Sequence, residues 1–252
     1  MKKFLALMLC LILALSFVAC TGTENENGES QSESQSESQN ENTFDPSAKS
    51  EGVMTYAEYD AAALDAEVVI EAYVQAHQDW WDNKVTVYAQ DPDGAYFIYE
   101  MACSEADAAK LTPGTKIKVT GVKGAWAGEV EIMDATFEFV ESEKWTAEAF
   151  DATSLLSNEA ELIKHQNKLV TFKDLEIAKI EYKNGEPGDD IYVTVKQGDA
   201  EYSFCVERYL TGPDSDVYEA VGELEAGDKV DVTGFLYWYE GVNTHITAVT
   251  AK

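Results

Sequence analysis

The sequence predicts an all-β protein with short helices, in which two five-stranded barrels follow a signal peptide and a disordered tether. Three observations lead to this prediction. The first twenty residues form a charged and then apolar leader, residues 21–50 are polar and repetitive, and the remainder contains one segment twice. Apolar residues make up 45% of the 252 residues, which suits a folded chain and excludes disorder throughout.

Residues 1–19 have the pattern of a lipoprotein signal peptide. Lys2 and Lys3 give a positive start, and an uncharged apolar run then ends abruptly before Cys20. The segment FVAC, which ends at Cys20, resembles the bacterial lipobox, with Phe17 standing where Leu is usual. This resemblance implies a diacylated Cys20 at the mature N-terminus, and two acyl chains suffice for stable anchoring. An ordinary secretory signal is the alternative, and no cleavage site of the A-x-A type supports it.

Residues 20–50 are expected to be a lipidated cysteine followed by an acidic tether. The stretch from residue 29 to residue 40 reads ESQSESQSESQN, a four-residue repeat almost without apolar side chains. Such a composition buries too little apolar surface to fold, so we expect a disordered stalk. The protein is therefore expected on the extracytoplasmic face of a bacterial cell membrane, anchored through Cys20.

The rest of the chain contains two copies of one unit, which we place at residues 51–142 and 143–252. The segment from Leu111 to Ala135 aligns without a gap to the segment from Leu224 to Ala248. An ungapped match of this length indicates an internal duplication. Two copies are too few for a solenoid, so each copy is expected to be a domain.

Each copy shows five strand-like segments and one helix-like segment. Alternating apolar residues predict the first copy's strands at 68–78, 84–90, 95–101, 116–122 and 129–139. The same criterion predicts the second copy's strands at 169–180, 191–195, 201–206, 229–236 and 242–250. Ser104 and Asp216 are helix caps that predict helices at 105–111 and 217–224.

Paired glycines recur at matching positions of the two copies. Gly114 and Gly227 come just after the predicted helices, where a left-handed cap is needed. Gly121 and Gly234 are expected to end the fourth strand, where a closing barrel needs a bend or a bulge.

The order of three strands, a helix and two strands is the layout of the OB fold. The motif L-x-x-G-x-K-[IV]-x-V-x-G, at residues 111–121 and 224–234, resembles the helix-to-strand-four segment of bacterial OB modules. The two-copy region is similar to surface lipoproteins of Gram-positive bacteria that carry tandem OB folds. This resemblance implies the fold, and with it a ligand face on strands two and three. The motif contains no catalytic residue and implies no activity.

Aromatic residues are concentrated in the loops that flank this expected ligand face. The candidate ligand-binding residues are Trp80, Trp81 and Trp126 in the first copy and Tyr182, Tyr237, Trp238 and Tyr239 in the second. Exposed rings there would stack on sugars, bases or peptide side chains. The alternative is that these rings pack across the hairpins, because strands favour aromatic residues anyway.

Charge and motif content indicate a binding protein and not an enzyme. The chain has 18 Lys and Arg against 47 Asp and Glu, a formal charge of −29, which argues against nucleic acid as a partner. No catalytic motif, cofactor motif or metal-ligand spacing is present in the sequence. We expect a non-enzymatic ligand-binding or interaction module for a carbohydrate, peptide or protein ligand, without metal or cofactor. The alternative, which rests on fold analogy, is an envelope nucleic-acid-binding or nuclease-accessory protein.

Two cysteines occupy similar positions near the end of the third strand in each copy. Cys103 and Cys205 would form a disulfide only if the two sites came within bridging distance. The favoured interpretation is two free, buried thiols.

Overall fold

The computed structural model describes residues 44–252. The signal peptide at 1–19, Cys20 and the tether up to residue 43 lie outside the described residues. Residues 44–50, predicted to be disordered, pack against the first barrel. The Phe44 ring lies edge-on to Tyr73 with centroids 6.4 Å apart, and Lys49 Nζ lies 2.6 Å from the buried Oδ2 of Asp91. This part of the tether prediction is wrong. Asp91 is buried away from water, so the ion pair with Lys49 neutralises its charge and holds this segment on the barrel.

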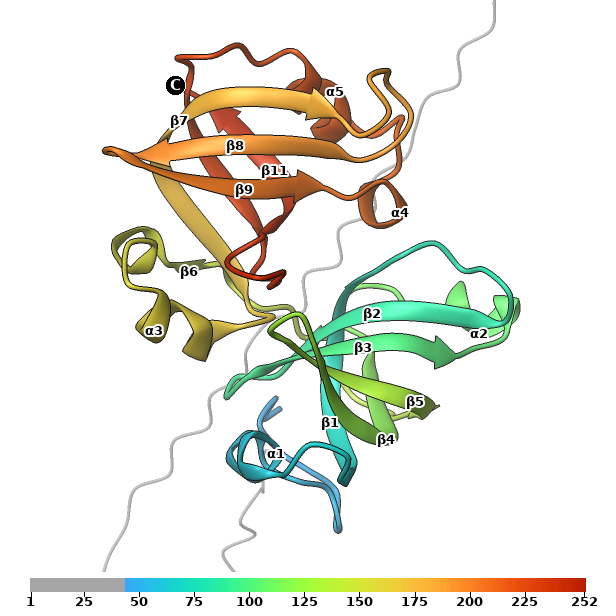
Figure 1. Ribbon diagram of the computed structural model, residues 1–252. Coiled ribbons are helices and arrows are strands. Elements are labelled where there is room, and N and C mark those ends of the chain that lie inside the picture. Colours follow the sequence, from blue (N-terminus) through green and yellow to red (C-terminus); the bar gives the residue numbers. More distant parts are fainter. Residues whose placement is uncertain (1–43) are drawn as a thin grey trace, which may run out of the picture. The chain divides into compact units, whose positions relative to one another are not determined.

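The first copy folds into a closed barrel with the strand order β1-β2-β3-β5-β4 (Figure 1). Its strands are β1 (Glu67–His77), β2 (Lys84–Gln90), β3 (Ala95–Ala102), β4 (Lys116–Trp126) and β5 (Glu129–Phe139). The parallel pairing of Phe97 with Glu131 and of Ile98 with Ile132 joins β3 to β5 and closes the barrel. Helix α1 (Tyr56–Ala61) precedes the barrel, and α2 (Glu105–Ala108) lies between β3 and β4, capped by Ser104.

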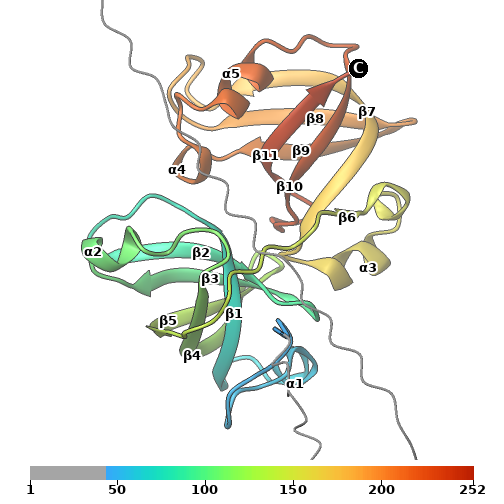
Figure 2. The ribbon, with the colours of Figure 1, turned by 180° about the vertical axis from the view of Figure 1, so that it is seen from behind.

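The second copy repeats this arrangement with one extra strand (Figure 2). Its sheet has the order β10-β11-β9-β8-β7-β6, and β10 also pairs with β7, which brings five of the strands into a ring. The strands are β6 (Phe150–Asp151), β7 (Leu169–Tyr182), β8 (Ile191–Gln197), β9 (Ala200–Val206), β10 (Lys229–Phe235) and β11 (His245–Ala251). The predicted all-β, OB-like fold class is confirmed.

Short helices connect the strands of the second copy. Helix α5 (Asp216–Gly222) lies between β9 and β10, at the position of α2 in the first copy. Helices α3 (Glu159–Leu162) and α4 (Arg208–Thr211) were not expected from the sequence. Both have only four residues, too few for a periodic apolar pattern to identify them.

Gly114 and Gly227 have left-handed backbone as expected, but they do not cap the helices, whose C-caps are Ala109 and Glu223. Gly114 has a φ of 83° and Gly227 a φ of 99°, which is the left-handed region. At Gly121 the pairing of β4 with β5 shifts register, and a Cβ there would lie 2.6 Å from Ile132 Cγ2. The strand does not end at Gly121, however, because β4 continues to Trp126.

The outer face of β2 and β3 in the first barrel is in contact with the second sheet. Tyr88, Phe97 and Phe235 form a buried cluster between them, and Tyr237 packs at its edge. The Tyr88 ring stacks on Phe235 with centroids 4.3 Å apart and an interplanar angle of 7°. The Tyr88 hydroxyl is also hydrogen-bonded to His245 Nδ1 at 2.8 Å. Part of the face that an OB fold offers to ligands is thus covered by the second copy.

Polar contacts surround this aromatic cluster. Glu129 Oε2 accepts the Trp238 backbone N–H at 2.9 Å, and the Gln166 amide bonds both the Gly128 carbonyl and the Val130 N–H. Burial raises the pKa of Glu129 to about 8, and burial lowers the pKa of His245 to about 4. Both side chains are therefore held largely neutral at pH 7.

The two cysteines of the folded region are free and buried, as favoured from the sequence. Burial raises the pKa of the Cys103 thiol to about 11 and shifts that of Cys205 further in the same direction. The domain limits at 51–142 and 143–252 stay a prediction.

Candidate ligand pocket

A tight hairpin after β1 presents Trp81 at the surface. Asp82 and Asn83 have φ values of 46° and 61°, the pair of positive values that a two-residue hairpin turn needs. Trp81 and Lys84 flank this turn and exchange two backbone hydrogen bonds, at 3.1 and 2.9 Å. The polar pair Asp82–Asn83 suits such a turn because Asn and Asp tolerate left-handed backbone.

The neighbouring tryptophans point in opposite directions, as alternation along a strand predicts. Trp80 packs against the core of the first barrel, and its Nε1 donates to the Cys103 carbonyl at 2.9 Å. Trp81 is 62% exposed. Of the two rings, only Trp81 is free to contact a ligand with its face.

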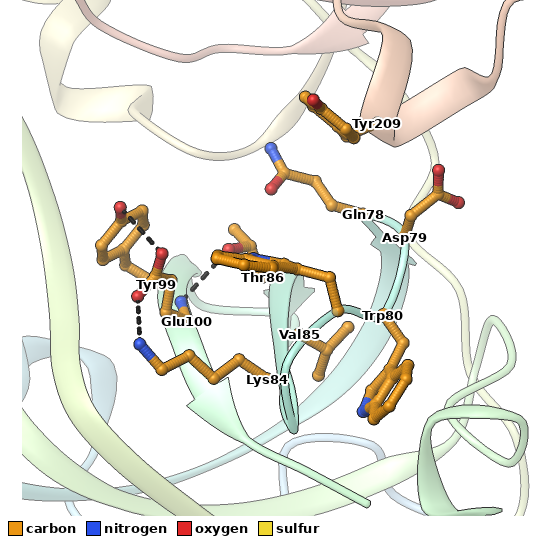
Figure 3. Close-up of a pocket in the computed structure, with 10 residues that line it drawn as sticks. Gln78, Asp79, Trp80, Lys84, Val85, Thr86, Tyr99, Glu100 and Tyr209 are labelled. Atoms are coloured by element: carbon orange, nitrogen blue, oxygen red, sulfur yellow. Dashed lines mark hydrogen bonds and ion pairs between the residues drawn. The ribbon is translucent and has the colours of Figure 1, made fainter. Parts of the chain in front are cut away.

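Trp81 borders a pocket of about 560 Å³, within the range of small-molecule sites. Figure 3 shows the lining side chains, which come from the loop after β1, from β2 and β3, and from α4 of the second copy. The residues around the pocket are Gln78, Asp79, Trp80, Trp81, Lys84, Val85, Thr86, Tyr99, Glu100 and Tyr209.

One wall of the pocket is a bonded set of side chains on β2 and β3. Lys84 Nζ lies 2.6 Å from Glu100 Oε2, and the Tyr99 hydroxyl donates to Glu100 Oε1 at 3.2 Å. Glu100 has a φ of 44°, and its N–H is bonded to Thr86 Oγ1 at 3.1 Å. The hydrogen bond and charge of Glu100 raise the pKa of Lys84. The single cation of the pocket is therefore already neutralised.

The opposite wall includes a contribution from the second copy. The Asp79 N–H donates to the Tyr209 carbonyl at 2.7 Å, and Gln78 Nε2 donates to Glu207 Oε2 at 3.0 Å. These two bonds hold α4 against the end of β1. The pocket is therefore shared by the two copies and is incomplete in either one alone.

The other predicted ligand residues divide into exposed and supporting groups. Trp126 is 56% exposed and its ring lies 5.2 Å from that of the exposed Tyr239. This pair lies at the tips of the last hairpins, away from the pocket lining. Tyr182 packs on the core of the second sheet, and Tyr237 packs against Phe97 at 5.2 Å.

Trp238 belongs to the core and not to a ligand face. It is 3% exposed and packs within the apolar cluster of the second sheet. Its prediction as a ligand contact is corrected, because the packing of the sheet leaves no accessible ring face.

Several pocket residues were missed by the sequence reasoning. Tyr99 stands two residues after Phe97 on β3, so the period of two places both on the outer face of that strand. This alternation could have predicted Tyr99 as a pocket residue. No sequence pattern predicts Tyr209, because it lies on the second copy and reaches the pocket only where α4 contacts the residues after β1.

Within residues 44–252, no group of three or more His, Cys, Asp and Glu side chains is placed to hold a metal ion. None of the helices in this part of the chain is long and apolar enough to cross a membrane.

The fold defines the chain as an all-β protein with OB-like sheets, and comparisons with known proteins add distant structural neighbours. No family model matches the sequence, and no curated protein matches it. A murine DNA-binding protein solved with double-stranded DNA is 13% identical, with a TM-score of 0.34 over 74% of this chain and 97% of its own. The p204 HINb domain is 14% identical, with a TM-score of 0.33 over 72% and 95%. The Ifi202 HINa domain, solved with a 20-base-pair duplex, is 10% identical, with a TM-score of 0.33 over 75% and 97%.

One expectation from composition is corrected. Net charge alone does not argue against nucleic acid as a partner, and two of the three neighbours are described as complexes with double-stranded DNA. The physical weakness of that inference is that −29 sums the whole chain, whereas binding depends on the charges and rings at one local surface.

Proposed function

We propose that the folded part of this chain is a non-enzymatic binding module that holds a ring-bearing ligand in the Trp81 pocket. The observation that carries the proposal is the 62%-exposed Trp81 ring beside a hollow of about 560 Å³. An exposed aromatic face does not gain the free energy that burial of its apolar surface would give. A ligand that covers the ring would bury this surface and gain that free energy.

The chemistry of the pocket suits a ligand with a flat face and polar edges. Trp81, 43%-exposed Tyr99 and Tyr209 offer ring faces, while Gln78 and Asp79 offer oxygen acceptors. Stacking on an exposed ring is worth about 1–3 kcal/mol per contact on the nucleic-acid benchmark. A sugar ring with its hydroxyl donors uses both kinds of group, and so does an aromatic peptide side chain.

The proposal includes an anchor at the outer surface of a bacterial cell membrane. The leader, the apolar run that stops at Cys20 and the resemblance to Gram-positive surface lipoproteins support it. In this arrangement, the acidic stretch after Cys20 holds the binding module away from the lipid surface.

A second candidate function is binding of nucleic acid in the same pocket. Its support is the position of the rings beside β2 and β3, since every nucleobase has a face that stacks on an aromatic ring. Lys84 is the one Lys or Arg of the pocket lining, and it is paired with Glu100. A nucleic acid held there would be bound mainly by stacking, so its affinity would depend only weakly on salt.

The test is a binding screen against glycan, peptide and oligonucleotide arrays, followed by affinity measurements on variants. Trp81→Ala and Tyr99→Ala are expected to weaken binding about 5- to 150-fold, from 1–3 kcal/mol per ring. Trp126→Ala is the matched control, because Trp126 is similarly exposed but lies outside the pocket. Unchanged affinity in Trp81→Ala, or a larger loss in Trp126→Ala, would contradict the proposed site.

A further inference from the structure

A single buried carboxyl group connects the two copies at one wall of the Trp81 pocket. Glu207 caps α4, and its Oε1 accepts the Tyr209 backbone N–H at 3.0 Å. Its Oε2 accepts Gln78 Nε2 of the first copy at 3.0 Å. Gln78 and Tyr209 both line the pocket, whereas Glu207 is buried behind them.

The Gln78 amide has one end toward Glu207 and the other toward the pocket. Its Nε2 is used by Glu207, and its Oε1 makes no hydrogen bond within residues 44–252. Figure 3 shows the oxygen of Gln78 turned to the side of Thr86 and Tyr99, across the space that a ligand would occupy. In this state, Gln78 offers the ligand an acceptor.

Protonation of Glu207 would reverse this arrangement. The backbone N–H of Tyr209 can only donate, so Oε1 must remain the acceptor and the proton goes to Oε2. A protonated Oε2 faces Gln78 as a donor, and two donors cannot share a hydrogen bond. Rotation of the Gln78 amide by a half-turn restores the bond, with Gln78 Oε1 accepting and Nε2 directed into the pocket.

We propose that Glu207 is a positioning residue that sets, through Gln78, whether the pocket offers its ligand an acceptor or a donor. With Glu207 ionised, the pocket favours hydroxyl or amine donors at this position. With Glu207 protonated, it favours carbonyl or carboxylate acceptors. The ligand consequence rests on the proposed function, but the coupling between the two side chains does not.

The surroundings of Glu207 place this change near neutral pH. Burial raises the pKa of Glu207 to about 7, and the neighbouring charge of Asp190 acts in the same direction. The bonds from Tyr209 and Gln78 oppose the increase. The other ionisable groups near this region are Tyr88 on β2, Cys205 on β9, Arg208 on α4, His245 on β11 and Lys183 in the loop after β7.

One other ionisable side chain adjoins Gln78 itself. His77 Nδ1 lies 2.7 Å from the Gln78 carbonyl oxygen. Glu207→Gln tests whether Glu207 causes a pH-dependent signal from Gln78, because it removes that carboxyl group and leaves the neighbouring imidazole in place.

The experiment follows the Gln78 side-chain amide by nuclear magnetic resonance in the ligand-free protein, from pH 5.5 to pH 8.5. The amide resonances of Gln78 and the carboxyl resonance of Glu207 are expected to shift together, with one shared midpoint near pH 7. Because no ligand is present, this result does not depend on the proposed function. Gln78 resonances that stay constant, or that follow a different midpoint from Glu207, would overturn the coupling.

Two variants complete the test. Glu207→Gln keeps an oxygen for the Tyr209 N–H and points an amide donor at Gln78, so it is expected to hold the low-pH spectrum of Gln78 at every pH. Glu201→Gln, an exposed position on the neighbouring strand β9, is expected to leave the wild-type titration unchanged. A Gln78 titration that persists in Glu207→Gln would show that another group causes the signal and would refute the proposal.

Discussion

The contact of Tyr88 with Phe235 is expected to make the two copies unfold together. Tyr88 is fully buried although it lies on the outer face of the first barrel, and its ring stacks on Phe235 at 4.3 Å. Removing a buried aromatic ring costs about 3–5 kcal/mol, so Tyr88→Ala should reduce the free energy of unfolding by that amount. Tyr88→Phe removes only the bond to His245 and should cost about 1–3 kcal/mol, because a buried ring nitrogen is left unpaired.

The assay is chemical denaturation of the two single variants, of Phe235→Ala and of the double variant. Residues in contact show interaction energies of about 0.5–3 kcal/mol, whereas distant residues add within about 0.3–0.5 kcal/mol. We expect a coupling in the first range between Tyr88→Ala and Phe235→Ala, and one unfolding transition for the wild type. Additive effects of the two substitutions, or two separate transitions in the wild type, would refute the packing of the second sheet on β2 and β3.

The remaining predictions concern exposure, backbone, charge and anchoring. Trp81→Ala should leave the melting temperature nearly unchanged, and Trp238→Ala should lower the free energy of unfolding by about 3–5 kcal/mol, because only the second ring is buried; equal losses would contradict this. Gly121→Ala should cost about 1–3 kcal/mol in a denaturation curve, because its Cβ overlaps the opposite strand; a neutral effect would show that the strand yields. The pKa of Glu129 lies above its unfolded value. The stabilisation that protonated Glu129 gives the folded state is therefore complete below pH 4.5 and is lost as the pH rises to about 8. Between pH 6 and pH 8, the free energy of unfolding of Glu129→Gln should therefore increase relative to that of the wild type by about 1.4 kcal/mol per pH unit. Parallel curves of stability against pH would exclude the raised pKa of Glu129. Cys20→Ala should release the protein into the medium or leave it unprocessed, and undiminished acyl labelling would end the lipoprotein proposal.

The strands were predictable because each has one face in a core. Apolar residues alternate along β2 and β4, and the observed limits of β2, Lys84–Gln90, are those read from the alternation. The strands of the second copy were predicted from the same alternation, at positions that the internal duplication supports. Alternation also predicted that Trp80 and Trp81 would point in opposite directions.

The contacts between the two copies were not predictable in the same way. Trp238 and Trp81 both follow a strand-like segment, and nothing in their local patterns distinguishes a core ring from an exposed one. The difference arises from tertiary packing, since Trp238 enters the core of the second sheet. Tyr209 likewise reaches the pocket only because Asp79 bonds its carbonyl.

The segment at residues 44–50 shows a further limit of composition. Its two Ser residues continue the polar composition of the preceding stretch, yet Lys49 and Phe44 each have a specific partner on the barrel. Composition averages over a window and therefore does not register two anchoring side chains.

The most direct measurement of the central claim is a crystal structure of the protein with a ligand identified on the arrays. The ligand is expected to lie against the Trp81 ring, between Tyr99 and Tyr209, with polar groups near Gln78 and Asp79. A ligand seated instead on the Trp126–Tyr239 pair, or elsewhere on the surface with the Trp81 pocket empty, would contradict it.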